Sequence, residues 1–234
     1  MIKIGLVLTV IGAVLLLAGP LGSRSGLWPF TVGLLMLALS VLLALVGASL
    51  SLVGGIKTGQ WGVAGAGIVL GLAMVSVPGA FIVSARGAPP IHDITTDPDN
   101  PPAFVAILPR RAGAANPPEY AGSEVSAQQR RSYPDIRPLV LSGSAADVFD
   151  RALAAVQDLG WDLVASDRAA GRIEAVDTTF WFGFKDDVVI RITPEASDRT
   201  ARVDVRSKSR VGVGDVGTNA RRVRTLLTRL QSSS

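Results

Sequence analysis

Residues 86–97 read RGAPPIHDITTD, and the aspartate at position 93 is the first acidic side chain in a chain of 234 residues. The preceding residues carry only four charged side chains, all of them basic: Lys3, Arg24, Lys57 and Arg86. All 19 acids and the other 19 of the 23 lysines and arginines follow. Because charged side chains are costly in lipid, this stretch divides an apolar region from a water-soluble one.

Three apolar runs without a charged residue precede this boundary, at about residues 4–21, 27–52 and 61–84. A helix rises about 1.5 Å per residue and the hydrocarbon core of a bilayer is about 30 Å thick, so each run can cross it. We therefore expect a transmembrane region over residues 1–86, with the first run retained rather than cleaved as a signal peptide. Uncharged spans argue against a transporter or channel.

Small residues and flanking charges bear on how this region packs and is oriented. Gly67 and Gly71 in the third run form a small-xxx-small element whose partner is either a neighbouring span or another chain. Lys3 and Lys57 on one side equal Arg24 and Arg86 on the other, and only the amino terminus slightly favours a start in the cytoplasm. We expect a multi-pass protein of the bacterial inner (plasma) membrane with its soluble domain on the periplasmic, extracytoplasmic side.

The net charge of +4 and the isoelectric point near 10.0 come entirely from the four bases of the apolar region. The soluble part is neutral overall, so nucleic acid is not an expected partner. The expected partners are the lipid bilayer and a protein in a membrane complex. The chain has no cysteine, which excludes disulfides and thiolate chemistry.

Residues 87–140 form a proline-rich connector that contains ten of the 14 prolines. Such a density disfavours helix, because each proline removes a donor and restrains the residue before it. We expect an extended strap laid against the soluble domain, with residues 112–129 as its least ordered part.

The soluble domain is expected over residues 141–232. Ser144 and Asp147 resemble a capping box, and apolar residues recur at helical spacing from there to Gly160. Four alternating strands and a final amphipathic helix follow, giving the order α-β-β-β-β-α. This order predicts an α+β two-layer sandwich, in which a four-stranded antiparallel sheet carries two helices on one face.

The strand alternation predicts a polar second face on this sheet. It directs four charged side chains away from the helices: Arg191, Arg202, Asp204 and Arg206. Either this face is solvated, which is common for antiparallel sheets, or the strap crosses it. In the second case Asp93 and Asp97 of the strap would pair with the arginines.

Four strings of the soluble region carry a resemblance to a known family: HDITTD at 92–97, GFKDDVVIR at 183–191, DVRSKSRVG at 204–212 and DVGTNARR at 215–222. Together they resemble the bacterial and plastid family catalogued as domain of unknown function 1499, over about residues 90–231. The resemblance implies a domain that is often membrane-attached or exported, and it brings no settled biochemical activity.

Several charged residues are candidates for binding a ligand or partner. The chain has one histidine, so His92 and Asp93 do not suffice for a catalytic metal centre. Carboxylates could instead collect a hard cation, although ordinary turn chemistry explains them better. Arginines near the start of the final helix could attract an anion. The candidates are His92, Asp93, Asp97, Asp186, Asp187, Arg191, Arg206 and Arg210.

Residues 180–184 read FWFGF and concentrate aromatic side chains between two strands. Core packing is one interpretation. The other is that Trp181 and Phe182 form an exposed tip that meets the membrane interface or a partner protein.

The sequence contains no recognisable catalytic constellation, and we expect no cofactor and no metal. The preferred hypothesis is a non-enzymatic, membrane-anchored envelope protein whose soluble domain binds a partner protein or envelope component. One alternative is a small domain that binds anions or other ligands or is weakly hydrolytic. Another is an accessory subunit of a larger membrane complex that associates through Gly67 and Gly71.

Overall fold

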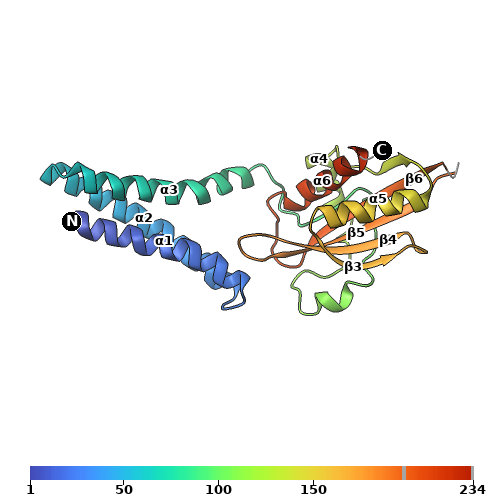
Figure 1. Ribbon diagram of the computed structural model, residues 1–234, viewed down its shortest axis with the longest axis horizontal. Helices are drawn as coiled ribbons and strands as arrows, with labels where there is room; N and C mark the ends of the chain where they lie inside the picture. The colour runs from blue at the N-terminus through green and yellow to red at the C-terminus, as the bar shows by residue number, and fades with distance from the viewer. Residues whose placement is uncertain (197–198, 233–234) are drawn as a thin grey trace. The chain divides into compact units, whose positions relative to one another are not determined.

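The computed structural model describes residues 1–196 and 199–232 of the chain, which forms two compact units. The first unit contains Met1–Gly87 together with Phe180–Gly183, and the second contains Ala88–Thr179 and Phe184–Ser234. Figure 1 shows long helices in the first unit and a sheet with helices in the second.

The first unit is built from α1 (Ile2–Arg24), α2 (Phe30–Thr58) and α3 (Trp61–Ala85). Each of the three helices is long and apolar enough to cross a membrane, as the sequence predicted. Large apolar side chains point outward along all three, while most buried positions in α1 and α2 hold glycine, alanine, serine or threonine. This inversion of the usual soluble pattern is expected where lipid surrounds the helices.

Glycines spaced seven residues apart hold α1 and α2 together. A Cβ atom on Gly5 would lie 2.6 Å from the carbonyl oxygen of Gly47, and one on Gly19 would lie 2.7 Å from that of Gly33. The pairing runs antiparallel, and Gly12 meets Ser40 between these two contacts. We call these six residues the glycine seam. A seven-residue spacing keeps one stripe facing the partner helix along its whole length.

The small-xxx-small element of α3 packs against α2 of the same chain. A Cβ atom on Gly71 would lie 2.9 Å from both the Ala44 carbonyl oxygen and the Ala48 Cβ, and Gly67 faces the Ser51 side chain. Of the two partners that the sequence left open for this element, the structure therefore shows the neighbouring span.

The second unit contains one antiparallel sheet of six strands rather than the four that were predicted. The strand order is β1-β6-β5-β4-β3, and β2 also pairs with β6. The bounds are β1 (Asp93–Thr95), β2 (Leu139–Ser142), β3 (Asp162–Asp167), β4 (Arg172–Thr178), β5 (Lys185–Pro194) and β6 (Thr200–Ser209).

The two additional strands pair with the same edge of β6. Strand β1 pairs with Arg206–Lys208 near one end of β6, and β2 pairs with Thr200–Val203 near the other end. Both are short and lie beside proline-rich sequence, so neither has the alternation that identifies a strand over four or more residues. The predicted four-stranded sheet was incomplete because partner strands from the strap complete this edge.

Helices α5 (Ala145–Asp158) and α6 (Thr218–Ser232) cover one face of the sheet (Figure 1). The capping box between Ser144 and Asp147 is present, and α5 ends before Gly160, whose φ is 70°. The main core lies between these helices and the inward side chains of the strands. One charged side chain of α6, Arg222, is buried rather than on the exposed face of this amphipathic helix.

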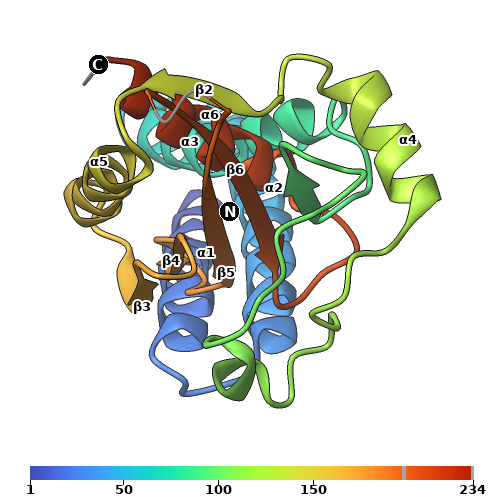
Figure 2. The same ribbon diagram turned by 90° about the vertical axis from the view of Figure 1, so that its right-hand side faces the viewer.

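The strap covers the opposite face of the sheet. In Figure 2, β5 and β6 separate α5 from this green segment. A small second core joins Phe104 and Ile107 of the strap to Val176 and Val189 of the sheet. The strap also contains a short 3-10 helix, η1 (Leu108–Arg111), and the helix α4 (Ser123–Ser132). The expectation of a non-helical strap is thus wrong for α4, which occupies a proline-free stretch.

Candidate functional site

The face of the sheet beneath the strap carries a set of buried charged side chains. Because side chains alternate along a strand, residues from four strands project to this side. We call the set the charged face, and its buried members are Asp93, Glu174, Asp187, Asp204, Arg206 and Lys208. Burying an unpaired charge costs free energy, so the partners of each buried charge indicate the role of the charged face.

Arg206 and Lys208 hold Asp93 at the centre of the charged face. Arg206 donates to both carboxylate oxygens of Asp93, from Nε at 2.9 Å and from Nη2 at 2.8 Å, and Lys208 Nζ lies 2.9 Å away. Burial lowers the pKa of Lys208, and Asp93 opposes that shift. Arg206 also donates to the carbonyl oxygens of Pro102 and Pro118 and so ties two parts of the strap to β6.

Aromatic rings of the strap flank the Arg206 guanidinium. Its Cζ lies 4.8 Å from the ring centroid of Phe104 and 5.5 Å from that of Tyr120. Rings in this position attract a cation through their quadrupole and shield it from water. Burial, and then the charge of Asp93, raises the pKa of Tyr120 to about 12.

Asp187 is fully buried and binds two arginines. Arg210 donates to it from Nη2 at 2.7 Å, and Arg111 of η1 forms a second, almost completely buried ion pair with it. Burial lowers the pKa of Arg111, while Asp187 raises it. Arg111 also donates to the Asn116 carbonyl oxygen, so this cluster fixes the strap beyond η1.

A third cluster lies at the other end of β6. Arg191 donates to Asp204 at 2.8 Å and to Asp97 at 3.2 Å, and Arg202 reaches both of the same carboxylates. These residues line a hollow of about 300 Å³ together with Asn100 and Thr193. The two arginines and two aspartates neutralise one another, so this hollow carries little net charge for a ligand.

Glu174 was not among the predicted residues, although its carboxylate fixes the strap directly. It accepts hydrogen bonds from the backbone amides of Val105, Ala106 and Ile107 at 2.9 to 3.1 Å. A glutamate within the alternating strand 172–178 was the available signal. Its partners lie 67 to 69 positions away in the sequence, and local pattern cannot identify them.

Asp186 points to the helix-covered face, away from its neighbour Asp187. Arg222 of α6 donates to it at 2.7 Å and also pairs with Asp177. Asn219 joins the same group by donating to Ser209 Oγ at 2.8 Å. Burial raises the pKa of Asp186, and Arg222 counteracts the shift. The two adjacent aspartates therefore belong to two different clusters.

His92 and Asp215 organise the turn between β6 and α6. The Nδ1 atom of His92 lies 3.1 Å from the Val213 carbonyl oxygen. The carboxylate of Asp215 accepts hydrogen bonds from the backbone amides of Gly217 and Asn219. Asp215 therefore binds the backbone amides at the start of α6, where the sequence suggested an anion site. The next residue, Val216, has a φ of 55°, a strained conformation for a β-branched residue.

The aromatic run lies at the tip of the β4–β5 hairpin. Phe180 and Trp181 are 69% and 50% exposed and contact each other edge to face, with ring centroids 5.2 Å apart. Phe182 is half-buried. Core packing therefore does not describe the first two rings, although their contact with a membrane or partner remains a prediction.

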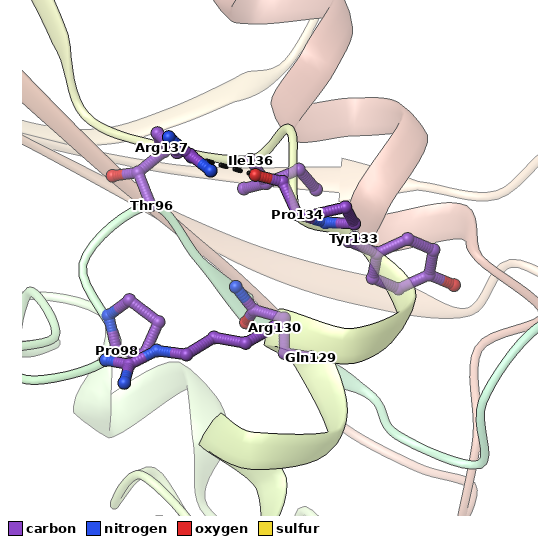
Figure 3. A pocket seen from close by; sticks show the side chains of 8 residues that line it. All are labelled: Thr96, Pro98, Gln129, Arg130, Tyr133, Pro134, Ile136 and Arg137. Carbon is purple, nitrogen blue, oxygen red and sulfur yellow. Dashed lines mark hydrogen bonds between the residues drawn. The ribbon is translucent and has the colours of Figure 1, made fainter.

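A groove of about 330 Å³ lies within the strap, between the segment that follows β1 and the end of α4 (Figure 3). Tyr133, Pro134 and Ile136 line one side of it, and Pro98 lies across from them. Two exposed arginines, Arg130 and Arg137, stand at its edge. Arg130 pairs with exposed Asp99 at 2.6 Å, and Arg137 donates from Nε to the Pro134 carbonyl oxygen.

The family described as "Protein of unknown function (DUF1499)" matches residues 93–230. The chain belongs to this family. The DUF1499 region begins at the first residue of β1 and ends within α6, so the strap lies inside the family domain. No curated protein matches the chain at a significant level.

The DUF1499 strings noted in the sequence meet in the clusters described above. Asp93 and Asp97 come from the first string, Asp186, Asp187 and Arg191 from the second, and Arg206 and Arg210 from the third. Within residues 1–196 and 199–232, no group of three or more histidine, cysteine, aspartate or glutamate side chains is placed to hold a metal ion. Chemically, this arrangement clamps the strap to the sheet.

Proposed function

We propose that this DUF1499 protein is a non-enzymatic, multi-pass membrane protein whose second unit binds a partner protein or envelope component through its outer surface. One observation carries the proposal: Asp93, Asp186, Asp187 and Asp204 of the family strings are each paired with arginine or lysine. A catalytic or ligand-binding carboxylate needs an open side toward its substrate. Asp93 and Asp187 are instead enclosed by two cations each.

The groove of Figure 3 is the best-supported contact surface for such a partner. Its volume of about 330 Å³ suits one or two side chains of a peptide better than a large cofactor. Of the two arginines at the edge, Arg130 pairs with Asp99, whereas the hydrogen bond that Arg137 donates goes to the backbone carbonyl oxygen of Pro134. We therefore expect the partner to present an apolar group next to a carboxylate, which arginine binds through two hydrogen bonds.

Site-specific photo-crosslinking in cells tests this proposal. A photoreactive residue at position 137 of the full-length chain is expected to give a discrete adduct with one protein or envelope polymer. The same residue at the exposed Asp162, in strand β3, is the matched control. Equal adducts from the two positions, or none from position 137, would contradict the proposal.

A small-ligand function is the second candidate, because the same groove could accept a free anionic molecule. Thermal unfolding of the full-length protein with inorganic phosphate, glycerol phosphate or calcium chloride separates the two possibilities. A bound ligand raises the melting temperature by mass action. A rise that Arg137→Ala abolishes would favour this candidate over the binding of a macromolecule.

The proposal places the second unit on the extracytoplasmic side of a bacterial inner membrane. Lys3 and Lys57 on one side balance Arg24 and Arg86 on the other, so the amino terminus, which slightly favours a start in the cytoplasm, and the odd number of spans support this orientation. Fusion of alkaline phosphatase after Ser234 is expected to be active, and a fluorescent protein fused there should stay dark. The reverse pair of results would place the unit in the cytoplasm.

Association as an accessory subunit is supported less well, because α2 covers the surface formed by Gly67 and Gly71. Another lipid-facing surface would have to form such a contact. Purification in a mild detergent followed by native mass spectrometry is expected to show no stoichiometric companion held through α3. A companion that is lost in a Gly71→Leu variant would restore this candidate.

A further inference from the structure

The β4–β5 hairpin tip lies at the same end of the sheet as the segment that follows α3. The register pairs Thr178 with Lys185, Asp186 with Ser209, and Asp93 with Lys208. The end of β4, the start of β5, the end of β6 and the start of β1 are therefore together. The β3–β4 and β5–β6 turns lie at the opposite end of the strands.

This end exposes large apolar side chains from two loops. Phe180 and Trp181 belong to the hairpin tip, and Val213, which is 81% exposed, belongs to the β6–α6 loop. The second loop contacts the incoming chain, because the Asp215 amide donates to the Ile91 carbonyl oxygen at 3.3 Å. Exposed aromatic and aliphatic groups in adjoining loops are unusual for a surface that meets only water.

The charge of these two loops is positive. Lys185 is exposed at the base of the hairpin, and Arg221 is exposed in the first turn of α6. The one acid in residues 178–185 and 209–218, Asp215, is bound to backbone amides. Tryptophan and phenylalanine between basic residues match the interface of an anionic bilayer, where aromatic rings lie among headgroups and nearby bases are attracted to the negative surface.

The length of the connecting chain limits how far this end can be from the bilayer. Helix α3 ends at Ala85, and the chain is buried in the second unit from Ile91 onward. Six residues span at most about 22 Å when fully extended. If α3 crosses the membrane, this end of the sheet therefore stays within reach of the lipid headgroups.

We propose that the β4–β5 hairpin tip and the β6–α6 loop form a docking surface for anionic lipid, with Phe180, Trp181 and Val213 inserted at the bilayer interface and Lys185 and Arg221 facing lipid phosphates. The proposal rests on the membrane attachment proposed above. It adds a second contact with the bilayer that orients the groove of Figure 3 relative to the membrane.

Spin labels on single cysteines test the proposal, because the natural chain contains no cysteine. The variants are Phe180→Cys and Val213→Cys, both at exposed positions, with Ala169→Cys at the exposed β3–β4 turn as the matched control. Full-length protein is reconstituted in vesicles of phosphatidylcholine and phosphatidylglycerol. The ratio of oxygen to nickel-chelate collision is measured for each label by electron paramagnetic resonance.

The expected collision ratio is several-fold higher at positions 180 and 213 than at 169, and it falls when Lys185→Glu and Arg221→Glu are added. Equal ratios at all three positions would overturn the docking surface. Low collision with both reagents at 180 and 213 would also overturn it, in favour of a protein contact. Washing the vesicles with carbonate tests the membrane attachment separately. Protein that stays in the vesicles with water-exposed labels contradicts the docking surface alone. Protein that is released from the vesicles contradicts the membrane attachment as well.

Discussion

In the helices of the first unit, the closest contacts are made where side chains are smallest, whereas beneath the strap they are made by buried ions. Gly5 and Gly47 bring two backbones together without any side chain between them. Asp187 holds the strap through two arginines. In both regions one segment of the chain packs closely against another. The kinds of contact differ because apolar helices that associate would leave lipid, whereas the strap leaves water.

In lipid, apolar side chains gain little by leaving the solvent, so helices associate through close packing of their backbones. In water, a strap with few large apolar residues gains little hydrophobic stabilisation. Phe104 and Ile107 supply its buried anchor, and the charged face provides the remaining contacts. Buried ion pairs contribute little net stability but penalise any other pairing, so they determine where the strap lies rather than how strongly it is held.

The largest expected effect comes from removing one partner of a buried cluster. Asp187→Ala leaves Arg111 and Arg210 without their shared carboxylate and is expected to lower the free energy of unfolding by about 3–5 kcal/mol. Denaturant unfolding of the full-length protein in detergent, followed by near-ultraviolet circular dichroism, measures the loss.

Asp162→Ala is the matched control for this change. Its side chain is 64% exposed in the pair with Arg110, so the expected loss is about 0–1 kcal/mol. Similar losses in the two variants would show that the charged face is no more than a set of surface ion pairs.

The glycine seam is tested by adding bulk. Gly47→Leu places a side chain where the carbonyl oxygen of Gly5 lies 2.6 Å from the Cβ position. Forcing the helices apart is expected to cost about 1–3 kcal/mol. Gly65→Leu is the control, because a Cβ atom there meets nothing within 4 Å. Thermal unfolding in detergent, followed by far-ultraviolet circular dichroism, should separate the two, and equal melting temperatures would contradict close backbone packing.

Val216 allows a change in the stabilising direction. Its left-handed backbone conformation costs a β-branched residue about 1–2 kcal/mol, and asparagine tolerates that conformation better. Val216→Asn is therefore expected to raise the free energy of unfolding by about 1 kcal/mol in the same denaturant assay. Val213→Asn in the same loop should leave it nearly unchanged, and a matching gain there would point to a general effect of polarity.

Tyr120 tests the charged face through pH, with no effect expected near neutrality. The pKa of its phenol is raised from 10.0 to about 12 in the folded chain, so folding opposes its ionisation. The stabilisation is complete below pH 10 and is lost as the pH rises through about 12. Absorbance titration should show phenolate forming late, and Tyr120→Phe should remove that part of the alkaline instability. Tyr133, whose pKa burial also raises, provides the comparison variant Tyr133→Phe.

Local sequence patterns predicted the three apolar helices and the order from α5 to α6. The capping box at Ser144 and the left-handed Gly160 were identifiable because their signals lie within a few residues. Strand β1 was not identifiable, because it has three residues and its partner lies over 110 positions later. The glycine seam was not predicted, because the seven-residue spacing of Gly5, Gly12 and Gly19 does not by itself identify which helix packs against them.

The site was predicted only in part, because some of its contacts follow from local sequence pattern and others do not. Charge and alternation placed Arg191 and Arg206 on one side of the sheet and suggested Asp93 and Asp97 as their partners, and these ion pairs are present. Alternation could not show that Arg111 binds Asp187, since Arg111 lies in a 3-10 helix, or that the partners of Glu174 are backbone amides of the strap. Those contacts depend on the path of the strap, which short-range pattern does not determine.

The pairing of β1 and β2 with β6 has a consequence for the order of synthesis. Strand β6 is the last strand to be made, and both partners on its outer edge are made before the rest of the sheet. Until β6 leaves the ribosome, the strap has no edge to pair with and its acids have no arginines from that strand. Closing loops of this length is slow. The domain can therefore complete its sheet only once β6 has been made, and during that interval a chaperone or protease could act on the unpaired strap.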